Sequence, residues 1–102
     1  MSITVTNVEI DNTYEITGTF VDKNGDPVAA SDTKFRVYSS DYMTEMITPI
    51  IMTEGATLGT YVAYLYTGLL TAGKYIFRIE GTVATKIIGD NEYVKIMYVE
   101  PE

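Results

Sequence analysis

The sequence contains neither cysteine nor histidine among its 102 residues. Without cysteine, the chain can form no disulfide, no thiolate nucleophile and no cysteine-ligated metal site. Without histidine, it lacks the commonest general base and the commonest metal ligand, and any serine or cysteine nucleophile that depends on an imidazole is excluded. We therefore expect a protein that is not an enzyme and that uses no cofactor.

Positive charge is scarce as well. Seven basic residues face 14 acidic ones, which leaves a formal net charge of −7. Such a surface repels phosphate backbones, so we expect no direct binding to nucleic acid. No run of about 18 apolar residues is present to span a bilayer. The opening "MSITVTNVEIDN" is polar and alternating, without the basic and apolar regions of a signal peptide, so no membrane is expected among the partners.

What the sequence does contain is the pattern of short strands. β-branched and aromatic residues recur with period two, and Gly, Asn, Asp or Pro separates the runs. The length favours one domain over residues 1–102. The expected strands cover Ile3–Ile10, Thr13–Asp22, Thr33–Ser40, an edge strand near Met46–Thr53, and the runs "GTYVAYLYTG" (59–68), "GKYIFRIEGTV" (73–83) and "NEYVKIMYVE" (91–100).

About seven short strands with frequent turns predict an all-β fold, a single immunoglobulin-like antiparallel β-sandwich. The tryptophan and cysteine pair of antibody domains is absent. One corner signature is present, because "LLTAGKY" places a leucine and a glycine just before Tyr75, as in a tyrosine corner at the start of a penultimate strand. The segment Met43–Met52 is harder to interpret, since Pro49 would interrupt both a helix and a central strand.

Acidic residues offer one motif. Asp22, Asn24 and Asp26 form a D-x-N-x-D string of the kind found in calcium loops. The match then fails, because Pro27 occupies the position of the required glycine and Thr33 that of the bidentate glutamate. We interpret the string as a turn and predict no metal site. The remaining carboxylates are scattered over turns and strand exteriors, without the paired arrangement that glycosidases use.

Arg78 and Glu80 stand out in the apolar run Lys74–Val83. Tyr75, Phe77 and Ile79 are expected to face the core, which puts Arg78 and Glu80 on the outer face, roughly 7 Å apart. One interpretation is a solvated face with cross-strand ion pairs. The other is an interface with a partner, in which arginine is a frequent anchor.

The strand Thr60–Tyr66 carries the stronger interface signal. Tyr61, Ala63 and Leu65 fit the core, which leaves Val62, Tyr64 and Tyr66 pointing outward. Three such residues in a row are unusual on a lone sandwich, so a second layer or another subunit is expected to cover them. Tyr93 and Met97 on the last strand are candidates to extend this patch. The alternative, that tyrosine simply tolerates exposure on a strand, stays open.

Three stretches together carry a resemblance to a known family: "FVDKNGDPV", "FRVYSSD" and "GTYVAYLYTGLLTAGKYIFRIEGT". They resemble a small immunoglobulin-like domain of tailed-phage structural proteins, with its D-x-x-G-x-P-V turn and its [P/A]-G-x-Y-x-x-R-x-E-G block. The last block corresponds to Ala72, Gly73, Tyr75, Arg78, Glu80 and Gly81, with Ile79 in place of the usual tryptophan. The resemblance covers residues 16–82.

The resemblance implies a structural protein of a phage virion, such as a capsid decoration or cement protein or a head–tail accessory. Major capsid proteins, tail proteins or further copies of the chain would be its partners, in a multicopy assembly formed in the host cytoplasm. A chain of this length with its own Met1 is expected to be a stand-alone virion protein. The alternative is a module that recognises carbohydrate or a cell-surface partner, although the expected loops "KNGDP", "ASD" and "IIGDN" carry no aromatic residue.

Overall fold

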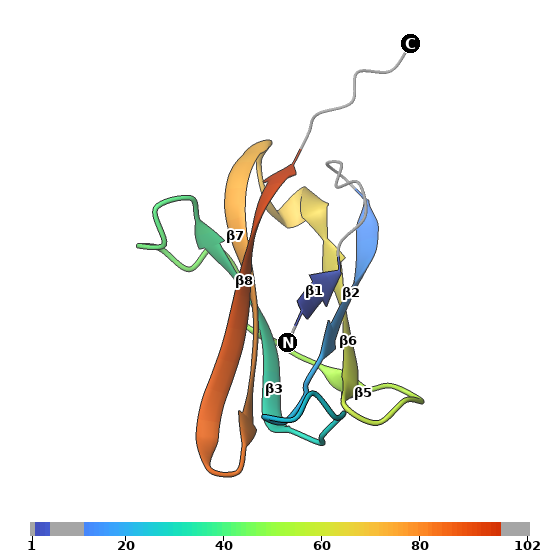
Figure 1. Ribbon diagram of the computed structural model, residues 1–102. Helices are drawn as coiled ribbons and strands as arrows, with labels where there is room; N and C mark the ends of the chain where they lie inside the picture. Colours follow the sequence, from blue (N-terminus) through green and yellow to red (C-terminus); the bar gives the residue numbers. More distant parts are fainter. Residues whose placement is uncertain (1, 5–11, 97–102) are drawn as a thin grey trace.

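The computed structural model describes residues 2–4 and 12–96 and shows an all-β protein made of two antiparallel sheets. One sheet has the strand order β1-β2-β6-β5 and the other has the order β4-β3-β7-β8. Figure 1 shows the sheets as separate layers, with β3, β7 and β8 on the left and β2, β5 and β6 on the right. Within the described residues the strands are Ser2–Thr4 (β1), Thr13–Thr19 (β2), Ser31–Ser39 (β3), Ile50–Ile51 (β4), Thr53–Glu54 (β5), Thr60–Tyr66 (β6), Gly73–Val83 (β7) and Lys86–Ile96 (β8).

The strand order is that of an immunoglobulin-type sandwich. The chain crosses between the sheets after β2, after β4 and after β6, so that β2 pairs with β6 and β3 pairs with β7. In the immunoglobulin arrangement the first, second, fifth and fourth strands form one sheet, and the third, sixth and seventh form the other. Here β4 is an additional edge strand beside β3. The predicted immunoglobulin-like sandwich is confirmed.

The core lies between the sheets and follows the predicted alternation. Every second side chain of the four central strands points inward, and the fully buried ones contribute about 1.5–3 kcal/mol each relative to exposure. Two edge-to-face aromatic pairs, Phe20–Tyr61 and Phe35–Phe77, have ring centroids 5.5 and 5.2 Å apart. The buried apolar side chains of these strands include Ile16, Phe35, Val37, Tyr61, Ala63, Leu65, Tyr75, Phe77 and Ile79.

Gly18 lets the two sheets approach closely. It occupies an inward-facing position of β2, where a β-carbon would lie 2.6 Å from Cδ1 and 2.9 Å from Cγ2 of Ile79. Ile79 belongs to β7 in the opposite sheet and is fully buried. A glycine inside a strand usually lowers stability, but it is suited to a position where another group comes close to the backbone. Here the Ile79 side chain occupies the space that a side chain at position 18 would need.

The predicted tyrosine corner at Tyr75 is confirmed. A short 3₁₀ turn, Thr67–Leu69 (η1), follows β6 and leads the chain across to β7. The Tyr75 hydroxyl donates a hydrogen bond of 2.7 Å to the carbonyl oxygen of Thr71. The bond ties the first turn of the crossing to the start of the penultimate strand, which is the role of this corner in immunoglobulin-like sandwiches.

The segment predicted as one edge strand near Met46–Thr53 forms two edge strands instead. β4 pairs with β3 and β5 pairs with β6, so the chain changes sheets between them. Met52 is the residue at the crossing, and its side chain is buried. Its backbone N–H donates to the Thr33 carbonyl at 3.0 Å. The residue pattern of this segment indicated an edge strand. A period of two cannot show that one residue, Met52, is buried at the point where the chain passes from one sheet to the other.

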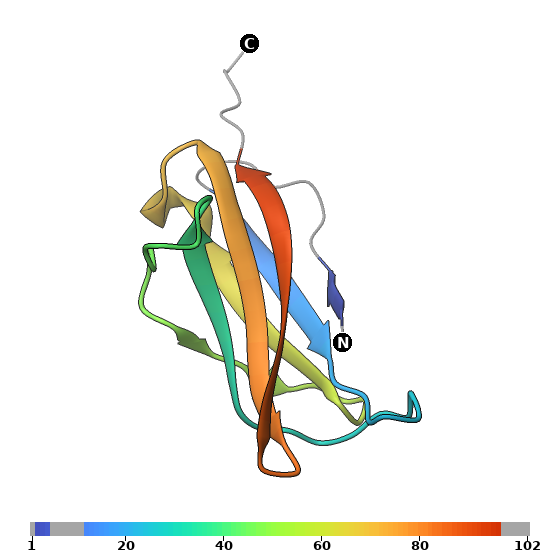
Figure 2. The same cartoon turned by 60° about the vertical axis from the view of Figure 1, so that its left-hand side comes forward.

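The last strand begins earlier than predicted. β7 and β8 form a long hairpin that runs the length of the sandwich (Figure 2), joined by Ala84 and Thr85 with positive φ angles of 50° and 68°. Residues 87–91, interpreted as a loop, lie within β8. Two-residue hairpin turns usually contain Asn or Gly, so Ala-Thr gave no turn signal, whereas "GDN" inside the strand gave a false one.

Of the expected first strand, β1 contains Ser2–Thr4, and residues 5–10 lie outside the described part of the chain. The same holds for residues 97–100 of the expected last strand. Over residues 2–4 and 12–96 the structure contains no helix long and apolar enough to cross a membrane.

Candidate interaction surfaces

The outward-facing row on β6 is where the sequence predicted it. Tyr64 and Tyr66 expose 62% and 48% of their surface, and Val62 is half-buried. β6 lies between β2 and β5, so these side chains stand on the outer face of a sheet rather than at a loop tip. The Tyr64 hydroxyl donates to Oε2 of Glu15 on β2 at 3.4 Å. We call Val62, Tyr64 and Tyr66 the tyrosine face.

Two features give the tyrosine face its shape. The ring of Tyr66 lies against Gly68 in η1, where a β-carbon would come within 2.4 Å of the ring. Beside Tyr64 and Val62 there is a shallow hollow, which reaches Ile50 and Ile51 where the chain crosses from β4 to β5. Ile51 is 78% exposed. The tyrosine face therefore continues into further apolar surface, which is typical of an interface centre.

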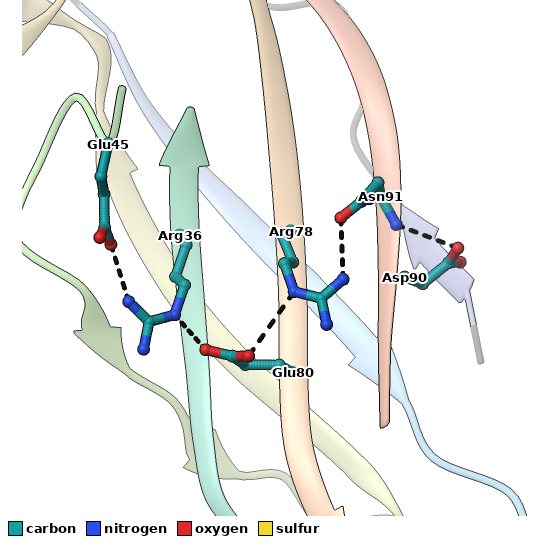
Figure 3. Close-up of polar contacts among 6 residues, drawn as sticks. All are labelled: Arg36, Glu45, Arg78, Glu80, Asp90 and Asn91. Carbon is teal, nitrogen blue, oxygen red and sulfur yellow. Dashed lines mark hydrogen bonds and ion pairs between the residues drawn. The ribbon is translucent and has the colours of Figure 1, made fainter. Parts of the chain in front are cut away.

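The outer face of the other sheet carries Arg78 and Glu80, and both are held in a ladder of charged groups (Figure 3). Arg36 of β3 stands directly opposite Arg78 of β7. The Glu80 carboxylate bridges the two arginines: Oε1 accepts from Nε of Arg36, and Oε2 lies 3.6 Å from Nε of Arg78. Nη1 of Arg36 also contacts Glu45 at 2.9 Å, and Nη1 of Arg78 donates to Asn91 at 3.1 Å.

This ladder explains the pairing of like charges. Two opposed arginines repel each other, and a carboxylate between them removes most of the penalty. The hydrogen bond to Glu80 raises the pKa of the Arg36 guanidinium above its ordinary value, with a further contribution from Glu45. The guanidinium of Arg78 lies over Gly89 of β8, where a β-carbon would be 2.0 Å from Nη2. Glu80 therefore forms a cross-strand ion pair with Arg36 of β3, whereas its contact with Arg78 lies within β7.

An apolar row follows the ladder on the same face. Ile76 stands opposite Tyr38 on one side and Tyr93 on the other. Ile76 lies on the same outer face as Arg78, yet it is 3% exposed. Tyr38 stacks on Tyr42 with ring centroids 4.5 Å apart, and burial raises the pKa of the Tyr38 hydroxyl. Tyr93 is 77% exposed.

The interface candidates lie on two different faces of the sandwich. Val62, Tyr64 and Tyr66 lie on the outer face of the β1-β2-β6-β5 sheet, whereas Arg78, Glu80 and Tyr93 lie on the outer face of the opposite sheet. Tyr93 therefore cannot extend the tyrosine face. Met97 lies outside the described residues. Sequence reasoning missed Arg36 and Glu45, because both roles depend on strand pairing. The register of β3 against β7 brings Arg36 to Glu80, and an isolated bridge between Tyr38 and Glu45 brings Glu45 beside Arg36.

The D-x-N-x-D string forms the predicted turn. Oδ1 of Asp22 accepts the backbone N–H groups of Asn24 and Asp26 at 2.8 and 3.1 Å. One carboxylate oxygen is thus engaged in holding the turn between Val21 and Pro27, which form an isolated bridge. In the described part of the chain, no three acidic side chains gather in the way that a metal site requires.

Comparison of the chain with protein families, with curated proteins and with solved structures finds no significant match.

Proposed function

We propose that this chain is a non-enzymatic structural protein of a phage virion, which binds capsid or tail proteins or further copies of itself. The observation that carries the proposal is the tyrosine face. Tyr64 and Tyr66 stand exposed on the outer face of β6 and continue into apolar surface around Ile51. Such surface favours a partner that covers it, because tyrosine brings large contact area at a small cost in side-chain entropy.

The sequence resemblance supports the virion as the setting, and the fold is of the kind that the resemblance implies. Three of the motif residues that carry the resemblance have structural roles in this sandwich. Asp22 stabilises a turn, Tyr75 makes the hydrogen bond of the tyrosine corner, and Arg78 pairs with Glu80. Each of these three side chains is thus engaged in holding the fold. The residues left for binding are those on the sheet faces, which suits a protein that acts by covering surface.

Many weak contacts would suffice for this function. A standard protein interface buries about 800 Å² on each partner, which is a small part of the 6367 Å² that this chain exposes. On a symmetric shell, copies that also touch their neighbours gain effective concentration, so the assembly can be stable although each contact is weak. The net charge of −7 would keep unassembled copies soluble and away from the packaged genome.

The direct test is the copy number of the chain in purified particles of the phage that encodes it, measured by quantitative mass spectrometry. We expect a fixed stoichiometry relative to the major capsid protein or to a tail protein. Absence of the chain from mature particles would refute the proposal. Binding of the purified chain to neutral glycans on an array would favour the carbohydrate-recognition alternative instead.

A variant series then tests the tyrosine face. Tyr64→Asp and Tyr66→Asp should leave the fold intact, as judged by circular dichroism, and should abolish incorporation into particles. Leu58→Asp is the matched control, because Leu58 is also exposed, at 57%, but lies in the loop between β5 and β6. If both tyrosine variants are incorporated as efficiently as Leu58→Asp, the tyrosine face is not the interface.

A further inference from the structure

Basic residues are confined almost entirely to one side of the sandwich. β1, β2, β5 and β6 contain no lysine or arginine. Five of the seven basic residues of the chain project from the outer face of the sheet that contains β3, β7 and β8. These five residues are Lys34, Arg36, Lys74, Arg78 and Lys95. An acidic protein thus carries one locally basic surface, opposite the tyrosine face.

The basic groups differ in how their charge is balanced. Arg36 and Arg78 share Glu80, as described above. Lys74 and Lys95 stand directly opposite each other on β7 and β8, both are exposed, and no carboxylate among the described residues forms an ion pair with either. Asp41 lies in the loop after β3, but its Oδ1 accepts hydrogen bonds from Ser39 and Met43. Like charges opposed across two strands destabilise the pairing.

The two lysines border a hollow that also has apolar walls. Ser40, Tyr93 and Val94 line it together with Lys74 and Lys95. Next to it lies the row formed by Tyr38, Ile76 and Tyr93, and on the far side of that row are the two arginines. An apolar centre with a charged rim, rich in tyrosine and arginine, is the usual anatomy of a protein–protein interface.

We infer that this surface, centred on Tyr93 and bordered by Lys74 and Lys95, is a second docking site, and that it takes an acidic surface of a different protein. Charge complementarity identifies the partner: carboxylates would supply the counter-charge that no residue of the described chain gives to the lysine pair. Nucleic acid fits less well, because the two arginines already hold carboxylates and the net charge of the chain is −7.

A second copy of the chain fits less well too. Its opposite sheet could offer few carboxylates, since Glu15 and Glu54 are the acidic residues of its described strands and Glu54 accepts a hydrogen bond from the Tyr61 hydroxyl. A chain with a neutral tyrosine face on one sheet and a basic face on the other can join two chemically different neighbours. The inference stands on the residues of the second sheet, and it does not require the tyrosine face to be an interface.

The test titrates a labelled polyglutamate peptide into the purified full-length chain at low salt and follows fluorescence anisotropy. We expect binding that weakens as salt is added. The double variant Lys74→Gln/Lys95→Gln should bind about tenfold more weakly, since each solvent-accessible charge pair contributes a factor of about two to five. Lys86→Gln is the matched control for the single variant Lys95→Gln, because each removes one charge from β8 and Lys86 faces the other side of the sheet.

Two further readouts separate docking from a structural role. The double lysine variant should unfold at a higher temperature than Lys86→Gln, because it removes the repulsion between two opposed charges. A variant that is more stable and yet binds more weakly shows that the lysines serve binding rather than the fold. Tyr93→Ser should weaken binding severalfold and leave its salt dependence unchanged, since an apolar contact is lost and no charge is altered. Tyr64→Asp should bind polyglutamate as the unmodified chain does, so failure of the tyrosine face would not affect this result.

Several outcomes would overturn the inference. Absence of binding would do so, and so would equal losses in Lys95→Gln and in Lys86→Gln, which would indicate unspecific attraction. If heparin or a single-stranded DNA oligonucleotide bound more tightly than polyglutamate, the partner would be a polyanion of another kind rather than an acidic protein. Self-association that disappears in the double lysine variant would assign the site to a second copy of the chain.

Discussion

Replacing Gly18 by alanine tests how closely the two sheets pack. The new methyl group would lie 2.6 Å from Cδ1 and 2.9 Å from Cγ2 of Ile79, well inside van der Waals contact. Ile79 is fully buried between the sheets, so its side chain has little room to move away. Overpacking of this kind costs about 1–3 kcal/mol. We expect Gly18→Ala to destabilise the protein by that amount, although alanine normally suits a strand no worse than glycine does.

The partner substitution makes the prediction specific. Ile79→Val removes Cδ1, the atom closest to the new methyl group, and by itself should cost about 0.5–1.5 kcal/mol. In the double variant the alanine methyl fills part of the space that Cδ1 leaves. The cost of the double variant should therefore fall short of the sum of the single costs by about 1 kcal/mol, a coupling expected only for residues in contact.

Urea unfolding followed by circular dichroism measures these free energies, and thermal unfolding gives an independent check. A change of 1 kcal/mol corresponds to a shift in midpoint temperature of about 4–8 °C for a domain of this size. Ile96→Val is the control: Ile96 is also buried, but it pairs with Gly73 at the other end of the hairpin from the turn. Additive costs for Gly18→Ala/Ile79→Val, or a Gly18→Ala variant as stable as the unmodified chain, would refute the close packing.

Three further predictions concern individual polar groups. Tyr75→Phe removes the corner hydrogen bond and should cost about 1 kcal/mol in urea unfolding, whereas Tyr93→Phe should change nothing measurable; equal effects would contradict the corner. Glu80→Gln leaves two opposed arginines without their shared carboxylate and should cost about 1–3 kcal/mol at low salt, with partial recovery in high salt. The hydrogen bond from the Ser39 hydroxyl, with another from a backbone N–H, holds the pKa of Asp41 below its usual value, so its stabilising contribution is present above about pH 4 and is lost as pH falls through the folded-state pKa. Asp41→Asn should remove that part of the pH dependence, and identical acid-unfolding curves would contradict the assignment.

The two outer faces of the sandwich differ in chemistry, and this difference bears on how the chain would work in an assembly. The tyrosine face contains no charged residue, although Glu15 contacts Tyr64 and Glu54 lines the hollow beside it. Contacts made by the tyrosines themselves should therefore depend little on salt. The opposite face is basic around an apolar row, so contacts there should weaken as ionic strength rises. Under the proposed function, dissociation of the chain from particles at several salt concentrations would show which face dominates the attachment.

Much of the fold was predictable because strand periodicity is a local property. The alternation of apolar and polar residues predicted the strands β2, β3, β6 and β7. In β6 and β7 it also predicted the buried faces, down to Leu65 and Phe77. The tyrosine corner was predictable for the same reason, since Tyr75 and the carbonyl that it binds are close in the sequence. The failures lay where local signals mislead: the hairpin turn at Ala84 and Thr85 lacks turn residues, and Gly89 looks like a loop residue but leaves room for Arg78.

The sequence by itself determined the class of fold, the inward residues of the central strands and the exclusion of disulfides and of cysteine or histidine chemistry. Composition and the two-residue alternation along a strand do not depend on which strands become neighbours. The tertiary structure alone decided which outward residues share a face. The pairing of β3 with β7 and of β7 with β8 brings Arg36 to Glu80 and sets Lys74 opposite Lys95. The assignment of β6 and β8 to different sheets separates Tyr64 from Tyr93. A surface is built from residues of several strands, and its membership depends on register and strand order, which no single stretch of sequence contains.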